Sequence, residues 1–84
     1  MNDMEIRNLA CELLSDIAPE TDATALRGDQ DIREALDLDS MDFLNFVIAL
    51  NQRTERVIAE EDYPKLFTLD GIVAFLGAGG KAAR

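Results

Sequence analysis

Apolar residues recur at helical spacing near the start of the chain. Between Asp3 and Ile17 they stand three and four positions apart, at Ile6, Leu9, Ala10, Leu13, Leu14 and Ile17. This spacing places them on one side of an α-helix. Asn2 or Asp3 can cap its first backbone amides, and Pro19 prevents the helix from continuing beyond Ala18. The pattern predicts an amphipathic first helix over residues 3–17.

The next stretch, from Pro19 to Asp31, is rich in residues that favour turns, namely Thr21, Asp22, Thr24, Gly28 and Asp29. We expect a long connector here, anchored to the core by Leu26. Asp31 can cap one short helical turn that contains Ile32 and Leu36. A connector of this length indicates that the two helices it joins need not be adjacent and antiparallel.

A second main helix is predicted from Ser40 to about Arg53, capped by Asp39 or by Ser40 itself. At roughly 100° per residue, the side chains that face the core are Phe43, Phe46, Val47 and Leu50. Met41 and Ile48 lie together between Ser40 and the polar face of this helix. This apolar pair is a candidate docking patch for a partner; alternatively, it shields the ends of neighbouring helices.

Two further helices complete the predicted fold. The three consecutive acids Glu60, Glu61 and Asp62 are favourable in the first turn of a short helix, because the amino-terminal end of a helix is positive. Pro64 keeps that helix short or distorted. Thr68 can cap a last helix, which we expect to end at Gly77. Its apolar stripe consists of Leu69, Ile72, Val73 and Leu76. The sequence predicts an all-α bundle of three main helices and one short helix, formed by residues 1–77 and followed by a flexible tail at residues 78–84.

The composition narrows the classes of function. A chain of 84 residues forms one domain, and its net charge of −9 argues against binding to nucleic acid or to an anionic membrane. Cys11 is the only cysteine, so no disulfide can form within the chain and nothing requires an oxidising compartment. The start of the chain is polar and acidic, unlike a secretory signal, and no apolar run approaches the ~20 residues of a membrane span. We therefore expect a monomeric, cytoplasmic protein with basic protein partners.

Ser40 is the residue that stands out chemically, because it lies between acidic residues where a loop gives way to a helix. A catalytic serine needs a base and oxyanion donors. The chain contains no histidine and no Gly-x-Ser-x-Gly motif. We therefore interpret Ser40 as a modification site that another enzyme acts on, and we expect the protein not to be an enzyme.

The residues around Ser40 resemble those of the acyl carrier proteins. The motif is Asp39-Ser40-Met41, with Leu36 before it and Leu44, Val47 and Leu50 after it. The resemblance continues without a gap through Ala49-Leu50, Lys65-Leu66, Thr68-Leu69, Ile72-Val73 and Phe75-Leu76. It covers nearly the whole chain.

The resemblance implies that Ser40, with Asp39 beside it, receives 4'-phosphopantetheine from coenzyme A through a phosphopantetheinyl transferase. The arm would hold acyl groups as thioesters in fatty-acid, lipid or polyketide-type synthesis. Acyl-transferring enzymes would dock on a surface formed by Met41, Asp42, Asn45, Ile48, Glu60 and Glu61. The resemblance also implies the small bundle fold, with its long loop between the first two main helices.

The chain departs from the family pattern along the second helix. Positions that usually carry glutamate look like Asn45, Asn51 and Gln52, which leaves Asp39 and Asp42 as the acids of that face. Fewer charges weaken electrostatic steering, so we expect a specialised member that is recognised more through Met41 and Ile48 than through charge. The competing interpretation is an acidic surface sufficient for ordinary synthase partners, made of Asp39, Asp42, Glu60, Glu61 and Asp62.

Further departures affect the packing. The glycine usually found three residues before the serine is Asp37, and an aromatic residue expected near the end of the second helix is Thr54. Phe43 and Phe46 add volume to the inward face, so an internal acyl pocket would be reduced; alternatively, they only replace the volume of the missing aromatic residue.

Two other functions fit the same residues. One is a peptidyl or aryl carrier that an adenylating enzyme loads, and the other is an unmodified helical interaction module. A calcium-binding EF-hand does not fit, because the required glycine and glutamate positions are Asp42 and Ile48. Gly79-Gly80-Lys81 lacks the strand and helix of a phosphate-binding loop, and we expect no metal site.

Overall fold

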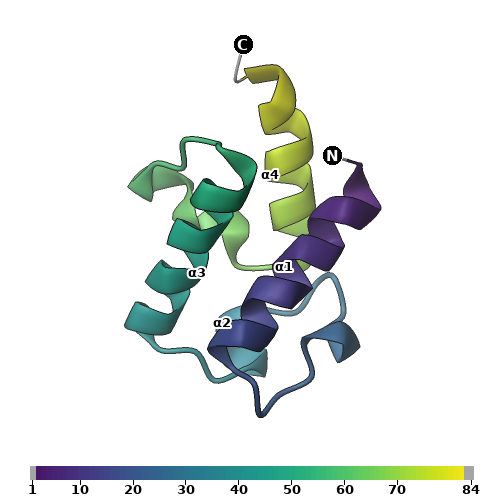
Figure 1. Cartoon of the computed structure of the whole chain (residues 1–84), viewed down its shortest axis with the longest axis vertical. Helices are drawn as coiled ribbons and strands as arrows, with labels where there is room; N and C mark the ends of the chain where they lie inside the picture. The colour runs from purple at the N-terminus through teal and green to yellow at the C-terminus, as the bar shows by residue number, and fades with distance from the viewer. Residues whose placement is uncertain (1, 83–84) are drawn as a thin grey trace.

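The computed structural model describes the backbone of residues 2–82 and the side chains of residues 2–77. Within these bounds the chain is helical and has no strand, which confirms the all-α prediction (Figure 1). The elements in chain order are α1 (Asp3–Ile17), the 3₁₀-helix η1 (Ala23–Ala25), α2 (Ile32–Ala35), α3 (Ser40–Thr54), the 3₁₀-helix η2 (Glu60–Leu66) and α4 (Leu69–Ala82).

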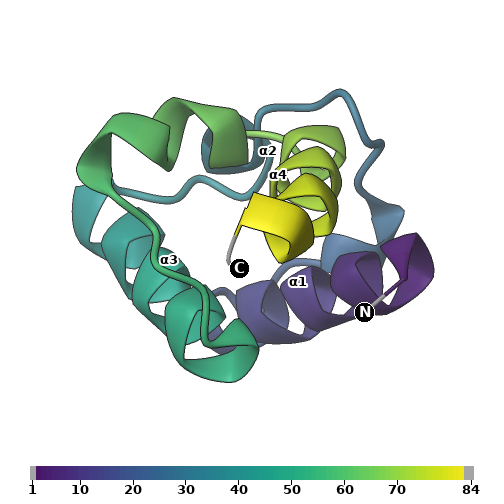
Figure 2. The same ribbon diagram turned by 90° about the horizontal axis from the view of Figure 1, so that it is seen from above.

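Helix α1 has the bounds that its apolar spacing predicts. The Asn2 side chain accepts a hydrogen bond from the Glu5 amide at 2.8 Å, and the Glu5 carboxylate accepts one from the Asn2 amide at 2.9 Å. This reciprocal pair of bonds is a capping box. The apolar stripe is buried except for the half-buried Ile17, and α1 packs against both α3 and α4. Seen from above, α1 and α3 lie along one side of the molecule, η2 and the connector along the other, and α4 between them (Figure 2).

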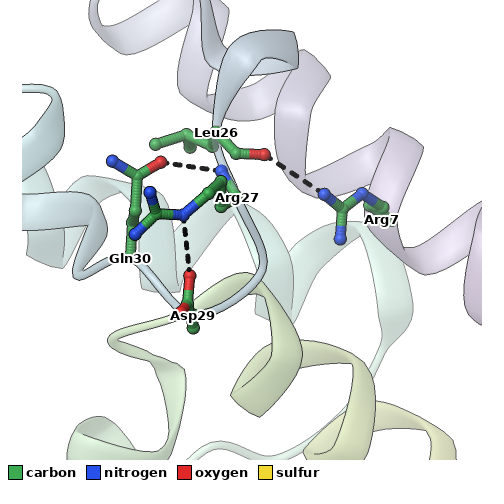
Figure 3. A network of polar contacts seen from close by, with 5 residues as sticks. All are labelled: Arg7, Leu26, Arg27, Asp29 and Gln30. Carbon is green, nitrogen blue, oxygen red and sulfur yellow. Dashed lines mark hydrogen bonds and ion pairs between the residues drawn. The ribbon is translucent and has the colours of Figure 1, made fainter.

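The connector between α1 and α3 holds η1 and α2, and its side chains are tied together by local polar contacts. Leu26 is buried, as predicted, and its carbonyl accepts a hydrogen bond from Arg7 of α1 at 3.2 Å (Figure 3). Arg27 pairs with Asp29 at 3.1 Å, and the Arg27 amide donates to the Gln30 side chain at 2.7 Å. Asp31 caps α2 by accepting from the Arg33 amide, which confirms its predicted role.

Two backbone hydrogen bonds attach this connector to the second half of the chain. The Ile32 amide donates to the Phe67 carbonyl at 2.8 Å, and the Asp70 amide donates to the Gly28 carbonyl at 3.0 Å. A side chain at Gly28 would collide with the Asp70 carboxylate unless that exposed side chain moved, so glycine favours the close approach seen here. The connector is therefore held between α1 and the start of α4.

Helix α3 turns its aromatic and aliphatic side chains inward as its periodicity predicts. The buried set is Phe43, Phe46, Val47 and Leu50. Thr54, which stands where the family resemblance predicts an aromatic residue, donates its hydroxyl to the Leu50 carbonyl at 2.6 Å. The helix then ends at Glu55, which has the left-handed backbone conformation φ 57°, ψ 30°.

The last two helices, η2 and α4, begin where the sequence predicts. The segment Glu60–Leu66 forms the 3₁₀-helix η2, with the three acids in its first turn and Pro64 inside it. The Thr68 hydroxyl accepts from the Gly71 amide at 2.9 Å and caps α4.

The prediction that α4 ends at Gly77 is wrong, because the backbone stays helical to Ala82. Glycine inside a helix costs only ~1 kcal/mol relative to alanine and keeps its amide donor, so it does not force an end. The predicted tail thus begins inside a helix, and residues 83–84 lie outside the described part.

The core of the described residues contains only apolar side chains, and no polar or charged residue there is buried. It joins side chains from every helix. Its largest fully buried side chains are Ile6, Leu14, Ile32, Phe46, Leu50, Leu66, Leu69 and Ile72. Helix orientation in such a core is set by packing, and the helix ends must satisfy their own hydrogen bonds.

The strained end of α3 predicts a stabilising substitution. A left-handed conformation costs an ordinary L-residue roughly 1–2 kcal/mol, and glycine does not have this cost. Part of the gain is offset because glycine also makes the unfolded chain more flexible. We therefore expect Glu55→Gly to raise the free energy of unfolding by about 0.5–1 kcal/mol in urea denaturation. Glu55→Ala is the control, and it should bring no gain because alanine retains the strain. Equal stability of all three proteins would contradict this account.

Candidate functional site

Ser40 is the first residue of α3, and its side chain is exposed. Asp39 caps the helix by accepting from the Asp42 amide at 2.8 Å, and the Asp42 carboxylate lies 3.4 Å from the Asp39 amide. The two aspartates thus form a capping box that fixes the first turn of α3. The capping role predicted for either Asp39 or Ser40 belongs to Asp39, and the Ser40 hydroxyl stays at the surface.

The turn that leads into Ser40 needs an unusual backbone conformation. Asp37 has φ 55°, in the left-handed region that glycine adopts most easily. Its neighbours Leu36 and Leu38 are buried and half-buried, so the turn sits on the core. The Leu38 amide donates to the Arg33 carbonyl at 2.8 Å across the turn. Aspartate tolerates this conformation better than most residues, which explains how the chain replaces the glycine that the family resemblance predicts.

An open groove of about 870 Å³ lies beside Ser40, between α2, the start of α3 and η2. Its apolar and aromatic lining, which is buried or half-buried, consists of Leu38, Phe43, Leu44, Tyr63 and Phe67. The ring of Phe43 lies edge-on to Phe67, with 5.3 Å between centroids, and to Tyr63, with 6.0 Å between centroids. The exposed acids that line it are Glu34, Asp37, Asp39 and Glu60. The groove therefore has an apolar, aromatic floor and an acidic rim.

Arg33 is the one basic side chain that lines this groove among the residues described. Its guanidinium bonds both carboxylate oxygens of Asp31, at 3.1 and 2.7 Å, and lies 3.5 Å from the centroid of the Phe67 ring. The hydrogen bond between the two side chains lowers the pKa of Asp31 and raises the pKa of Arg33. The arginine is thus held in one place by an ion pair and by stacking on an aromatic face.

The predicted partner surface divides into two parts. Met41 is 62% exposed and Ile48 is 46% exposed, so both apolar side chains face solvent as predicted, with the exposed Asn45 on the same helix. Glu60 lines the groove together with Ser40, whereas Glu61 is exposed and does not line it. The half-buried Asp42 takes part in the capping box.

Sequence reasoning missed three residues of this region, namely Arg33, Tyr63 and Phe67. The spacing of Asp31 and Arg33 is a local signal that could have suggested an ion pair. No local signal brings Phe67 to Arg33, because they come from segments far apart in the chain. Val57 was also missed; it is 89% exposed in the loop after α3 and adds an apolar side chain to the surface.

Cys11 takes no part in this site. It is half-buried, and its Sγ lies 3.6 Å from the Ala23 carbonyl. Burial raises the pKa of the Cys11 thiol, which disfavours the reactive thiolate. In the described part of the chain, no three side chains of the metal-ligating types are grouped as an ion site, and no helix is both long and apolar enough to cross a membrane.

Comparison of the chain with protein-family models, with curated proteins and with solved structures finds no match.

The capping box makes Asp39 a structural residue whose contribution can be measured. Loss of an aspartate cap costs a helix about 0.5–2 kcal/mol, whereas asparagine caps about as well. We expect Asp39→Ala to lower the free energy of unfolding by that amount and Asp39→Asn to keep most of it, in urea denaturation of both variants. An equal loss in both variants would mean that the charge of Asp39 matters and its cap does not, and no loss in either would mean that the cap contributes nothing.

Proposed function

We propose that this protein is a carrier, in which Ser40 bears 4'-phosphopantetheine and the thiol of that arm carries acyl groups. The observation that carries the proposal is an exposed serine on the first turn of a capped helix, directly after a left-handed turn and beside an open groove. The absence of histidine from the chain supports modification by a separate enzyme over catalysis by the serine itself.

The residues around Ser40 fit the prosthetic group. The hydroxyl is accessible, and the positive end of α3 favours a phosphate attached there. The cap holds the first turn in place, so an enzyme meets Ser40 in a defined position. When bound, the arm supplies a thiol that forms thioesters with acyl groups. The protein supplies the attachment point, the groove and the surface that enzymes recognise.

The arrangement of helices supports an acyl-carrier-like bundle. Three long helices surround one apolar core, η2 is short, and a long connector separates α1 from α3. Phe46 is fully buried and fills space on the inward face of α3. This favours a carrier that does not enclose a long acyl chain in its core.

The partners would be a phosphopantetheinyl transferase and acyl-transferring or adenylating enzymes. A specialised partner is supported by the exposure of Met41 and Ile48 on the helix that begins at Ser40, and by the uncharged Asn45 between them in the sequence. Exposed apolar side chains of this kind become buried when a partner docks.

The attachment of the arm is tested by mass spectrometry. The protein is incubated with coenzyme A, magnesium and a broad-specificity phosphopantetheinyl transferase. We expect the wild type to gain one phosphopantetheine and Ser40→Ala to gain none, because the hydroxyl is the acceptor. Ser15→Ala, which removes a half-buried serine of α1, is the matched control and should be modified like the wild type. An unmodified wild type, or modification of Ser40→Ala, would falsify the proposal.

The docking surface is tested by the salt dependence of loading. If the contact is mainly apolar, transfer of a malonyl group by a fatty-acid-type transacylase should be slow and weakly sensitive to salt. For the enzyme that does load this carrier, the double substitution Met41→Ala, Ile48→Ala should cost about 1–3 kcal/mol of binding. Met4→Ala, at a similarly exposed methionine of α1, is the control and should cost nothing.

Efficient and strongly salt-sensitive malonyl transfer would overturn this view of the partner. It would indicate instead that Asp39, Asp42, Glu60, Glu61 and Asp62 form an acidic surface for ordinary synthase enzymes.

A further inference from the structure

The groove beside Ser40 combines two kinds of group that attract organic cations. Aromatic faces bind ammonium groups through their negative face, and carboxylates bind them through charge. Arg33 already lies over the Phe67 ring, so Tyr63, which is half-buried on the floor next to the buried Phe43, is the ring that remains for a second cation. The groove opens beside the attachment point, so a flexible arm on Ser40 can fold back into it.

The charge of the lining is strongly unbalanced. Four carboxylates line the groove against the single guanidinium of Arg33. That guanidinium is already paired with Asp31 at 2.7 Å, and one face is stacked near Phe67. Its charge is therefore largely compensated locally, and the acids of the rim determine the field in the groove. An acyl group with a second carboxylate would be repelled, whereas one with an ammonium group would be attracted.

We infer that the acyl group carried by this protein bears a protonated amine, which rests in the groove between the ring of Tyr63 and the carboxylates of Glu34 and Glu60. This inference rests on the carrier function proposed above and names its cargo as an aminoacyl group. A plain fatty acyl group would gain the contact with the floor but nothing from the rim. A dicarboxylic acyl group keeps one free carboxylate, which the carboxylates of the rim would repel.

The test compares three acyl groups of nearly equal size on the same arm. The transferase attaches the β-alanyl, butyryl or malonyl form of phosphopantetheine to the whole protein, and mass spectrometry verifies each product. Amide ¹H–¹⁵N spectra at about pH 6.5, where an aliphatic amine is protonated, then report contact of the cargo with the groove. We expect the shifts of groove residues, relative to the unacylated arm, to be about two- to fivefold larger for β-alanyl than for butyryl, and smallest for malonyl.

Variants locate the effect. Glu34→Gln with Glu60→Gln should remove most of the preference for β-alanyl. Asp16→Asn with Glu20→Gln changes the same number of exposed acids outside the groove lining and should leave the preference unchanged.

The possible failures are distinct. A protein that accepts no pantetheine overturns the carrier function and this inference with it. A protein that is loaded but ranks malonyl or butyryl equal to or above β-alanyl overturns the cargo assignment alone. A preference for β-alanyl that survives the Glu34, Glu60 double change overturns the role of the rim.

Discussion

The packing of α1 against both α3 and α4 is the constraint on which the other positions depend. Its buried stripe is the common surface for two helices that lie far apart in the sequence. The core of the described residues has no buried polar side chain, so no internal hydrogen bond or ion pair selects the helix orientations. The shapes of the packed apolar side chains and the local capping bonds determine the helix orientations instead. Ser40 is therefore placed by apolar packing further along α3, and its first turn is fixed by Asp39 and Asp42.

The parts of the fold that the sequence predicted well are those with local causes. The stripe of α1, the Asn2 cap and Pro19 define a helix whose predicted and observed bounds agree. The inward side of α3 follows from the 3.6-residue period, and the exposure of Met41 and Ile48 follows from the same geometry. The end of α4 was predicted wrongly because Gly77 weakens a helix without removing a hydrogen-bond donor.

The candidate site was only half predictable. Ser40 and its cap are adjacent in the sequence, so their relation follows from a short motif. The groove is assembled from α2, α3 and η2, and the stacking of Arg33 near Phe67 joins segments with no shared periodicity. The left-handed conformation of Asp37 was signalled only through the family resemblance, which predicts a glycine there. Non-local packing of this kind has no signature in a single chain.

The two backbone hydrogen bonds that fasten the connector also bear on the order of folding. Ile32 pairs with Phe67 and Gly28 with Asp70, so each bond closes a long loop of chain. Loop closure costs entropy, and contacts between distant segments form late unless other packing has already brought the segments together. The wall of the groove that contains α2 therefore depends on η2 and α4 being in place. During synthesis, Ser40 would leave the ribosome before its surroundings exist, and the groove beside it would form only once the last helix has been made.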